Sequence, residues 1–274
     1  MNHVISFSTG LSSALTVERV LQRYGRAYVV FMDTLIEDDD NYRFSQQMQD
    51  RWRKLYPGAM FVSLQEGRDP YEVASDENMI FNQKLHPCTR ILKIEQFTKW
   101  LKAFPTPPVV HIGIAFHEVH RCEAITRNYN AAGYEVEYPL LWRPIEHRPL
   151  TEVARADWGI EPPRMYEQGY SHANCGGRCV AQGIGDWVRT LTHYPERFAE
   201  VEEWEREMRK RPGLDRYAIC RDQSGGEVKP RTLESIRLEY EDRNRHQLDM
   251  FDLLSSGPGC VSCGIGDLLC EVPA

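Results

Sequence analysis

The sequence predicts a doubly wound α/β fold, in which a mainly parallel five-stranded sheet is followed by a helical C-terminal region. Five short runs rich in β-branched and aromatic residues alternate with segments of helical periodicity over the first 190 residues. Beyond them we expect a charged helix over 195–210, an irregular stretch over 213–229 and another helix starting at Pro230. We therefore predict one domain over residues 1–190 and a second region over 191–274.

The expected strands are bounded by turn residues and by the starts of amphipathic segments. Apolar residues then recur at helical spacing after the first strand, after Asn41 and after Lys93. The five strands are predicted over 4–7, 26–32, 59–64, 109–114 and 135–142.

Composition limits the functional classes. A hydrophobic fraction of 42% is sufficient for a substantial core, and a mean hydropathy of −0.52 is typical of a soluble protein. The net charge of −7 argues against non-specific binding of nucleic acid over the whole surface. With no apolar run of about 20 residues and no visible signal peptide, we expect a cytoplasmic protein that does not enter a membrane. Its eight cysteines then indicate metal ligands or catalytic thiols rather than a disulfide framework.

The first strand leads into a short polar turn over residues 8–13, and a helix follows. Such a turn presents backbone N–H groups and hydroxyls at the positive end of a helix, where a phosphate binds. An ordinary Ser-capped connection is the structural alternative. The turn lacks the Gly-Lys-Ser/Thr ending of a Walker loop and the three glycines of a dinucleotide-binding loop.

The segment Ser8-Thr9-Gly10-Leu11-Ser12-Ser13 resembles the loop Ser-Gly-Gly-x-Asp-Ser of the PP-loop ATP pyrophosphatases, the adenine nucleotide alpha-hydrolase-like superfamily. Ser8, Gly10 and Ser13 match, whereas Thr9 and Ser12 depart from the pattern. This variation favours the phosphoadenylyl-sulfate reductase-like branch. The resemblance implies a Rossmann-like fold that binds an adenine nucleotide. The implied nucleotide-binding residues are Ser6, Ser8, Thr9, Gly10, Leu11, Ser12, Ser13, Asp33, Thr34 and Gly113.

A second motif follows the second strand, where Asp33-Thr34-Leu35-Ile36-Glu37 resembles the family's Asp-Thr-Gly-x-x-x-Glu, with Leu35 in place of glycine. In the family this segment lies beside the nucleotide. The next residues, Asp38 to Asp40, are interpreted as negative charge at the N-terminus of a helix.

Two further segments carry charge at positions that the family uses. Arg90 and Lys93 lie near a helix start, where cations oppose the helix dipole and so indicate an anionic ligand; Cys88, nearby, is either part of this site or a buried thiol.

Gly113, Glu118 and Arg121 resemble the family's Gly-x-Arg-x-x-Glu-Ser-x-x-Arg, although position 115 is Ala. His117 and His120 are either replacement polar groups or surface residues. We predict catalytic roles for Arg90, Lys93, Glu118 and Arg121.

Two Gly-flanked cysteine pairs form the other chemical signal. Cys175 and Cys179, together with Cys260 and Cys263, supply the four thiolates of a zinc site or a [4Fe–4S] cluster. Alternatively, Cys175 and Cys179 have a sulfur-handling role and the C-terminal pair is a separate thiol switch. In a third interpretation the glycines at 176 and 177 only form a turn.

The resemblance implies an enzyme that cleaves ATP with Mg²⁺ to AMP and pyrophosphate, and so activates an acceptor for sulfur or nitrogen transfer. The acceptor is a small molecule or a nucleic acid base, and a homo-oligomer is compatible with the sequence. A sulfonucleotide reductase is ranked second, because the Glu-Cys-Gly-(Ile/Leu)-His tail of those enzymes is absent. A non-catalytic nucleotide-sensing or metal-binding protein is the third hypothesis.

Overall fold

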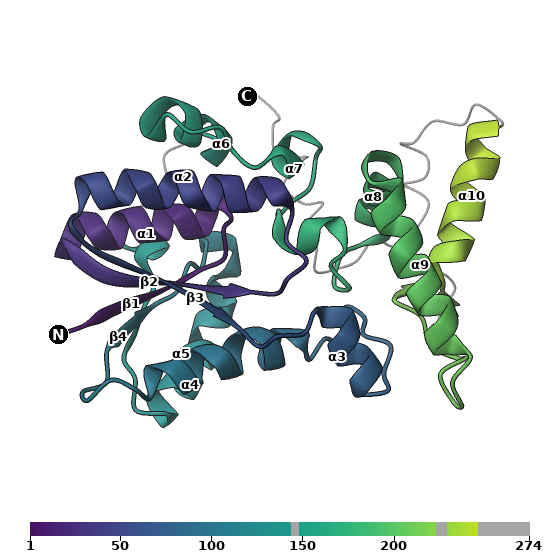
Figure 1. The fold of residues 1–274 in the computed structure, drawn as a ribbon, viewed down its shortest axis with the longest axis horizontal. Helices are drawn as coiled ribbons and strands as arrows, with labels where there is room; N and C mark the ends of the chain where they lie inside the picture. Colours follow the sequence, from purple (N-terminus) through teal and green to yellow (C-terminus); the bar gives the residue numbers. More distant parts are fainter. Residues whose placement is uncertain (144–147, 223–228, 246–274) are drawn as a thin grey trace. The chain divides into compact units, whose positions relative to one another are not determined.

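The structure is a computed structural model that describes residues 1–143, 148–222 and 229–245 (Figure 1). By compactness the chain divides into two units. Unit 1 comprises Met1–Arg68, Thr89–Glu167 and His172–Asn174, and unit 2 comprises Asp69–Cys88, Gln168–Ser171 and the described residues from Cys175 onward. The predicted ligands Cys260 and Cys263 lie outside the described residues. Each unit is built from several separate segments of the chain, so these units do not test the predicted division at residue 190. That division stays a prediction.

Unit 1 contains the predicted sheet, in which all pairings are parallel and the strand order is β3-β2-β1-β4-β5. The predicted doubly wound α/β fold is therefore confirmed. The strand order reverses at β1, so the crevice for a ligand is expected beyond the carboxyl ends of β1 and β4. The strands are β1 His3–Phe7, β2 Arg26–Asp33, β3 Gly58–Gln65, β4 Val109–His111 and β5 Val136–Glu137.

The last two strands are shorter than their predicted ranges. Strand β5 ends at Glu137, and Pro139 opens a short 3₁₀ helix over Pro139–Leu141. Proline has no N–H with which to continue a strand ladder, so the apolar residues after it pack as a helical turn instead.

Helices cover both faces of the sheet. Helices α1 and α2 lie on one face, and α4 and α5 lie on the other (Figure 1). A π-helical segment over Thr89–Glu95 leads into α4. The bounds are α1 Leu11–Tyr24, α2 Asp39–Leu55, α4 Gln96–Leu101, α5 Cys122–Ala131, α6 Leu150–Val153 and α7 Arg164–Glu167.

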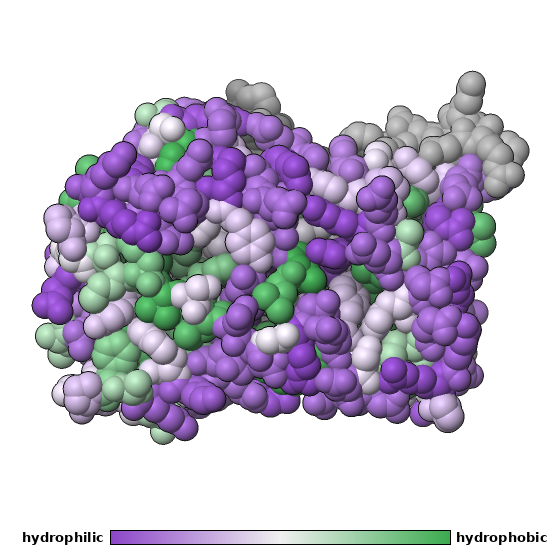
Figure 2. Space-filling model, in the orientation of Figure 1, coloured by the Kyte–Doolittle hydropathy of each residue, from purple (hydrophilic) through white to green (hydrophobic). Residues whose placement is uncertain are grey.

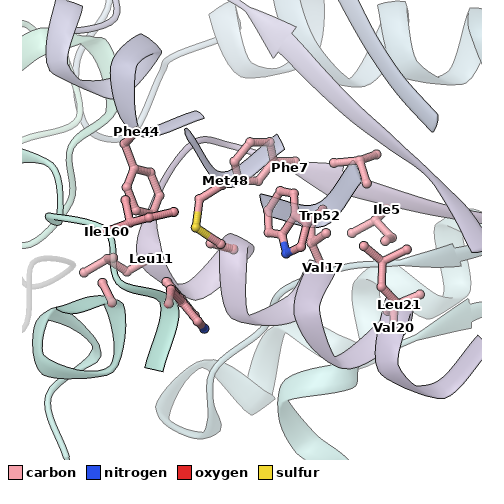
Figure 3. Close-up of a cluster of buried hydrophobic side chains, with 14 of the residues drawn as sticks. Ile5, Phe7, Leu11, Val17, Val20, Leu21, Phe44, Met48, Trp52 and Ile160 are labelled. Atoms are coloured by element: carbon pink, nitrogen blue, oxygen red, sulfur yellow. The ribbon is translucent and has the colours of Figure 1, made fainter. Parts of the chain in front are cut away.

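Alternate residues of β1 contribute to two separate cores. Ile5 and Phe7 pack with residues of α1 and α2, among them Trp52, and Figure 3 shows this cluster. Val4 packs on the opposite face with residues of α4 such as Phe97. This alternation follows from the two-residue period of a strand buried on both faces, and it holds β1 rigidly at the centre of the sheet.

The ends of the long helices have local sequence causes. Gly25 adopts φ 70° after α1, and its N–H donates to the Leu21 carbonyl at 2.8 Å. Asp38 caps α2, because its side chain accepts from the Asp40 N–H, and Asp39 and Asp40 occupy the first turn. The acidic run thus belongs to the helix N-terminus, as the sequence indicates.

Unit 2 is mainly helical. Its described elements are α3 Pro70–Asp76, the 3₁₀ turn Asn174–Gly177 (whose first residue belongs to unit 1), α8 Ile184–His193, α9 Pro195–Arg209, the strands β6 Cys220–Asp222 and β7 Lys229–Arg231, and α10 Leu233–Arg245. The predicted helix over 195–210 is confirmed as α9. Sequence reasoning missed the antiparallel β6–β7 pair, so the helix expected from Pro230 begins at Leu233.

Charges on α9 and α10 pair with one another. Arg237 of α10 forms an ion pair with Glu202 of α9 at 2.8 Å. Glu205 is buried and accepts from the N–H groups of Ile219 and Leu233, both at 2.7 Å. Within the described residues no helix is long and apolar enough to span a membrane.

Candidate functional site

The loop after β1 combines a glycine at the helix start with a left-handed residue before it. Gly10 is the N-cap of α1, and Thr9 adopts the left-handed conformation with φ 60°. Leu35, after β2, is also left-handed, with φ 65°. These are two positions where the resembled family has glycine and this chain does not. The backbone therefore keeps the conformation that favours glycine although the side chains differ.

Ser13 organises the loop through its hydroxyl. Ser13 Oγ donates to the Gly10 carbonyl at 2.8 Å and accepts from the Ser8 N–H at 3.2 Å. Ser8 Oγ lies at 3.2 Å from the same oxygen. Within the described chain the N–H groups of Ser12 and Ser13 have no acceptor, as expected in the first turn of a helix. The loop is thus closed by its own hydroxyl while these donors remain available to an anion.

Close packing joins the β4 loop to α1. A Cβ placed on Gly113 would lie 2.6 Å from Thr16 Oγ1, so a larger residue there would displace α1. Gly113 therefore lies against the first turns of α1, next to the phosphate loop. Ser6, by contrast, lies within β1 and pairs with Val30, one residue before the strand ends.

The β2 loop is ordered by its own side chains. Asp33 accepts from the Leu35 N–H at 2.9 Å and from the Tyr42 hydroxyl at 2.7 Å. Burial, followed by the hydrogen bond to Asp33, raises the pKa of Tyr42 above its ordinary value, so this hydroxyl remains protonated. Thr34 donates to Glu37 at 3.1 Å.

Lys93, one of the predicted catalytic cations, contacts the second motif, Asp33–Glu37. Its Nζ lies 3.9 Å from Oε1 of Glu37, whose side chain is only 1% exposed. The structure thus brings the Lys93 segment and the second motif together. Arg90 pairs with Glu95, and Arg121 pairs with Glu118, both at exposed positions on their own helical segments. Glu118 and Arg121 lie one turn apart on the 3₁₀ helix Phe116–Arg121.

The predicted metal ligands are described only in part. Cys175 is buried in unit 2 with φ 57°, and none of the described cysteines is in a disulfide. Burial raises the pKa of Tyr71 well above its usual range, and negative charge on Cys175 and Cys179 adds to this rise, so both thiols lie near Tyr71. The described residues include no group of three or more side chains placed to hold a metal. The four-cysteine site stays a prediction.

A groove of about 340 Å³ runs between α2 and β3 in unit 1. Figure 2 shows apolar side chains gathered on the surface over β3. The groove is lined by aromatic side chains, including Phe31 and Phe61, together with Asp33 and Tyr42. Polar side chains such as Arg53 and Gln49 line the groove as well, and the Arg53 guanidinium lies 4.7 Å from the centroid of the Phe61 ring.

The chain matches no protein-family model and no curated protein sequence. Among solved structures it is similar to a phosphoadenylyl-sulfate (PAPS) reductase from Candida auris, crystallised as a phosphate complex. That similarity has a TM-score of 0.39 and 13% sequence identity, and it covers 62% of this chain and 79% of that chain. The similarity is too distant to indicate a reaction, so the proposals below rest on this chain's own residues.

Proposed function

We propose that this chain is an enzyme that binds an adenine nucleotide at the carboxyl edge of its parallel sheet. The observation that carries the proposal is the loop after β1, which combines the left-handed Thr9, the Ser13 hydroxyl bridge and the open amides of Ser12 and Ser13. Nothing in a purely structural strand–helix connection requires a β-branched residue such as Thr9 to adopt a left-handed conformation. Backbone of this kind costs about 1–2 kcal/mol and clusters at functional sites.

The reaction proposed is cleavage of ATP between its α- and β-phosphorus atoms. An acceptor oxygen attacks the α-phosphorus, pyrophosphate leaves, and the acceptor becomes an adenylate that nitrogen or sulfur can displace. The loop would hold the departing pyrophosphate through its amides and hydroxyls. Mg²⁺ bound with ATP supplies charge neutralisation on the phosphates.

Lys93 supports this reaction through its position. Its ammonium lies 3.9 Å from the buried Glu37, which accepts a hydrogen bond from Thr34 of the second motif. We propose that this cation neutralises a phosphate of the bound nucleotide. Arg90 and Arg121 are proposed as further phosphate ligands that would exchange their glutamate partners for the anion. Such preorganised charge typically contributes about 10²–10³-fold in rate.

The groove beside Asp33 supports binding of the adenine ring. An adenine ring binds against apolar side chains bordered by polar groups, and this groove has Phe31 together with the Asp33–Tyr42 pair.

The test is product analysis with ATP labelled at the α-phosphate. Formation of AMP and pyrophosphate, lost in Lys93→Ala, is the expected result, and release of ADP would contradict the proposed bond cleavage. Because the acceptor is unidentified, water and added hydroxylamine serve as the nucleophiles that attack the α-phosphorus and release pyrophosphate. If ATP binds but is not cleaved, the chain is a nucleotide-binding protein without this activity.

A second candidate is favoured by the two thiols near Tyr71. In a sulfonucleotide reductase, a Cys thiolate attacks the sulfur of a sulfated adenine nucleotide, the sulfur–oxygen bond breaks, and the nucleotide leaves. A dithiol reductant then releases sulfite. Formation of sulfite from a sulfated nucleotide and a dithiol, lost in Cys175→Ala, would establish this candidate over adenylation.

A further inference from the structure

Tyr166 lies at the start of α1 although no sequence motif includes it. Its hydroxyl oxygen accepts from the Leu11 N–H at 3.3 Å. A Cβ placed on Gly10 would lie 3.0 Å from the same oxygen. The hydroxyl therefore lies at the phosphate loop, beside the amides that remain open at Ser12 and Ser13.

The bonding of this hydroxyl leaves its proton available. The N–H groups of Leu11 and Ala173 both face the oxygen and oppose the rise that burial causes in the pKa of Tyr166. The Leu11 N–H is a donor to this oxygen, and the O–H proton is a hydrogen-bonding group that no described contact uses. No acceptor for that proton is present among the residues that the structure describes.

The peptide at Ala173 is held firmly in place. Ala173 is buried, and its carbonyl accepts from Asn41 Nδ2 at 2.5 Å. Asn41 is fully buried in the first turns of α2, and its Oδ1 has no partner in the described part of the chain. Near Ala173, the Tyr166 O–H therefore lacks an acceptor and Asn41 Oδ1 lacks a donor, and these two groups do not bond to each other. Leaving the buried O–H of Tyr166 unpaired costs about 1–3 kcal/mol, and a ligand that accepts from it would remove this cost. The Asn41 oxygen is an acceptor and would need a donor, so a phosphate oxygen does not satisfy it.

We propose that the Tyr166 hydroxyl donates its proton to a phosphate oxygen of the bound nucleotide, and that Tyr166 is a further ligand-binding residue of the loop. This inference rests on the proposed nucleotide-binding function and deepens it. The anion would accept from Tyr166 and from the α1 amides together. Hydrogen bonds to an ionised acceptor are about twice as strong as neutral ones.

The experiment is calorimetric titration of the full chain with inorganic pyrophosphate and with ATP, comparing wild type with Tyr166→Phe. We expect both ligands to bind about tenfold more weakly to the variant. The control is Tyr24→Phe, which removes a tyrosine hydroxyl bonded to Glu137 at the other end of β1 and should leave both affinities unchanged. Equal affinities of wild type and Tyr166→Phe would overturn the inference. So would tighter binding by the variant, which would mean that the hydroxyl blocks the loop.

A second variant keeps the hydroxyl but displaces it. Gly10 has extended backbone, φ −87° and ψ 164°, so Gly10→Ala is conformationally allowed and its new Cβ meets chiefly the Tyr166 oxygen. It should weaken pyrophosphate binding in wild type, and this loss should shrink in the Tyr166→Phe background, where the oxygen is gone. Unchanged binding by Gly10→Ala, or an equal loss in both backgrounds, would contradict the inference. If wild type binds neither ligand, the proposed function fails as well; if it binds both with affinities independent of Tyr166, only this inference fails.

Discussion

The two ends of β1 carry polar clusters of opposite character. At the amino end, His3 Nδ1 lies 3.0 Å from His111 Nε2, and the Tyr24 hydroxyl donates to Glu137 at 3.2 Å. The other ring nitrogen of His111, Nδ1, lies 3.5 Å from Glu137 and makes no hydrogen bond in the described chain. At the carboxyl end, Ser13 closes the loop but the α1 amides and the Tyr166 proton have no acceptor in the described chain.

The two ends of β1 thus differ in what their polar groups contact: one another at the amino end, and no described acceptor at the carboxyl end. The amino-end cluster is packed by aromatic rings, with His3 stacked on Tyr24 at 3.7 Å, and its polar side chains contact one another. The carboxyl-end cluster keeps donors that an external anion can satisfy. We therefore expect changes at the amino end to alter stability, and changes at the carboxyl end to alter ligand binding and turnover.

The largest effect is expected at Lys93. Lys93→Ala removes the cation beside Glu37 and should lower the rate of ATP cleavage by about 10²-fold, because the charge that develops on the phosphates loses a preorganised partner. The measurement is the initial rate of AMP formation. Lys99→Ala, an exposed lysine of α4, is the matched control and should retain the wild-type rate. An unchanged rate in Lys93→Ala would remove this residue from the site.

The amino-end cluster predicts a strong dependence of stability on pH. Burial, then the neighbouring His3 and Arg23, lower the pKa of His111 from 6.5 to about 3. The unfolded chain consequently binds a proton more readily than the folded one, so stability falls as pH decreases from about 6.5 towards 3. Between pH 7 and pH 5 the free energy of unfolding should drop by about 2 kcal/mol from this group alone.

Urea unfolding of wild type and His111→Asn at the two pH values measures this drop. The variant should lose most of the pH dependence, while His193→Asn, at an exposed position, should keep it. Identical pH profiles for wild type and His111→Asn would contradict the assignment of His111 as the buried neutral histidine.

Ser13→Ala tests the closed loop. Deleting Oγ removes the hydrogen bonds to the Gly10 carbonyl and the Ser8 N–H, and should weaken pyrophosphate binding about tenfold, which corresponds to about 1.4 kcal/mol. Titration calorimetry measures the affinity. His111→Asn at pH 7.5 is the comparison from the amino end of β1, and its affinity should equal that of wild type. A larger loss in His111→Asn than in Ser13→Ala would break the division between the two ends.

The smallest effect concerns the left-handed residue after β2. Leu35→Gly relieves a left-handed strain of about 1–2 kcal/mol while adding about 0.4–1 kcal/mol of unfolded-state entropy. The net result should be stabilisation by about 0.5–1 kcal/mol in urea unfolding. Leu55→Gly, at a similarly exposed leucine at the end of α2, should instead destabilise the chain by about 0.5–1 kcal/mol. Destabilisation by both substitutions would show that Leu35 is not strained.

The sequence was sufficient to predict the sheet and the loop, because both depend on local patterns. Buried strands appear in the sequence as apolar runs, and the loops after β1 and β2 appear as short polar segments directly behind them. Lys93 and Glu37 both lie in segments that resemble family motifs, but no spacing in the sequence indicates that the two side chains contact each other.

Tyr166 could not have been found in this way. Its contact with Leu11 spans 155 positions, and it belongs to a four-residue helix with no periodicity of its own. The β6–β7 pair was missed for a related reason: its strands have three residues each, and Pro230 lies within one of them, where it suggests a helix start instead.

The most direct test of the central claim is a competition experiment between ATP and inorganic pyrophosphate for the wild-type chain with Mg²⁺. If the loop after β1 holds the β- and γ-phosphates, pyrophosphate should displace ATP competitively at one site per chain, and Ser13→Ala should weaken both ligands in parallel. ATP binding that pyrophosphate does not displace, or that Ser13→Ala leaves unchanged, would contradict the assignment of this loop as the phosphate site.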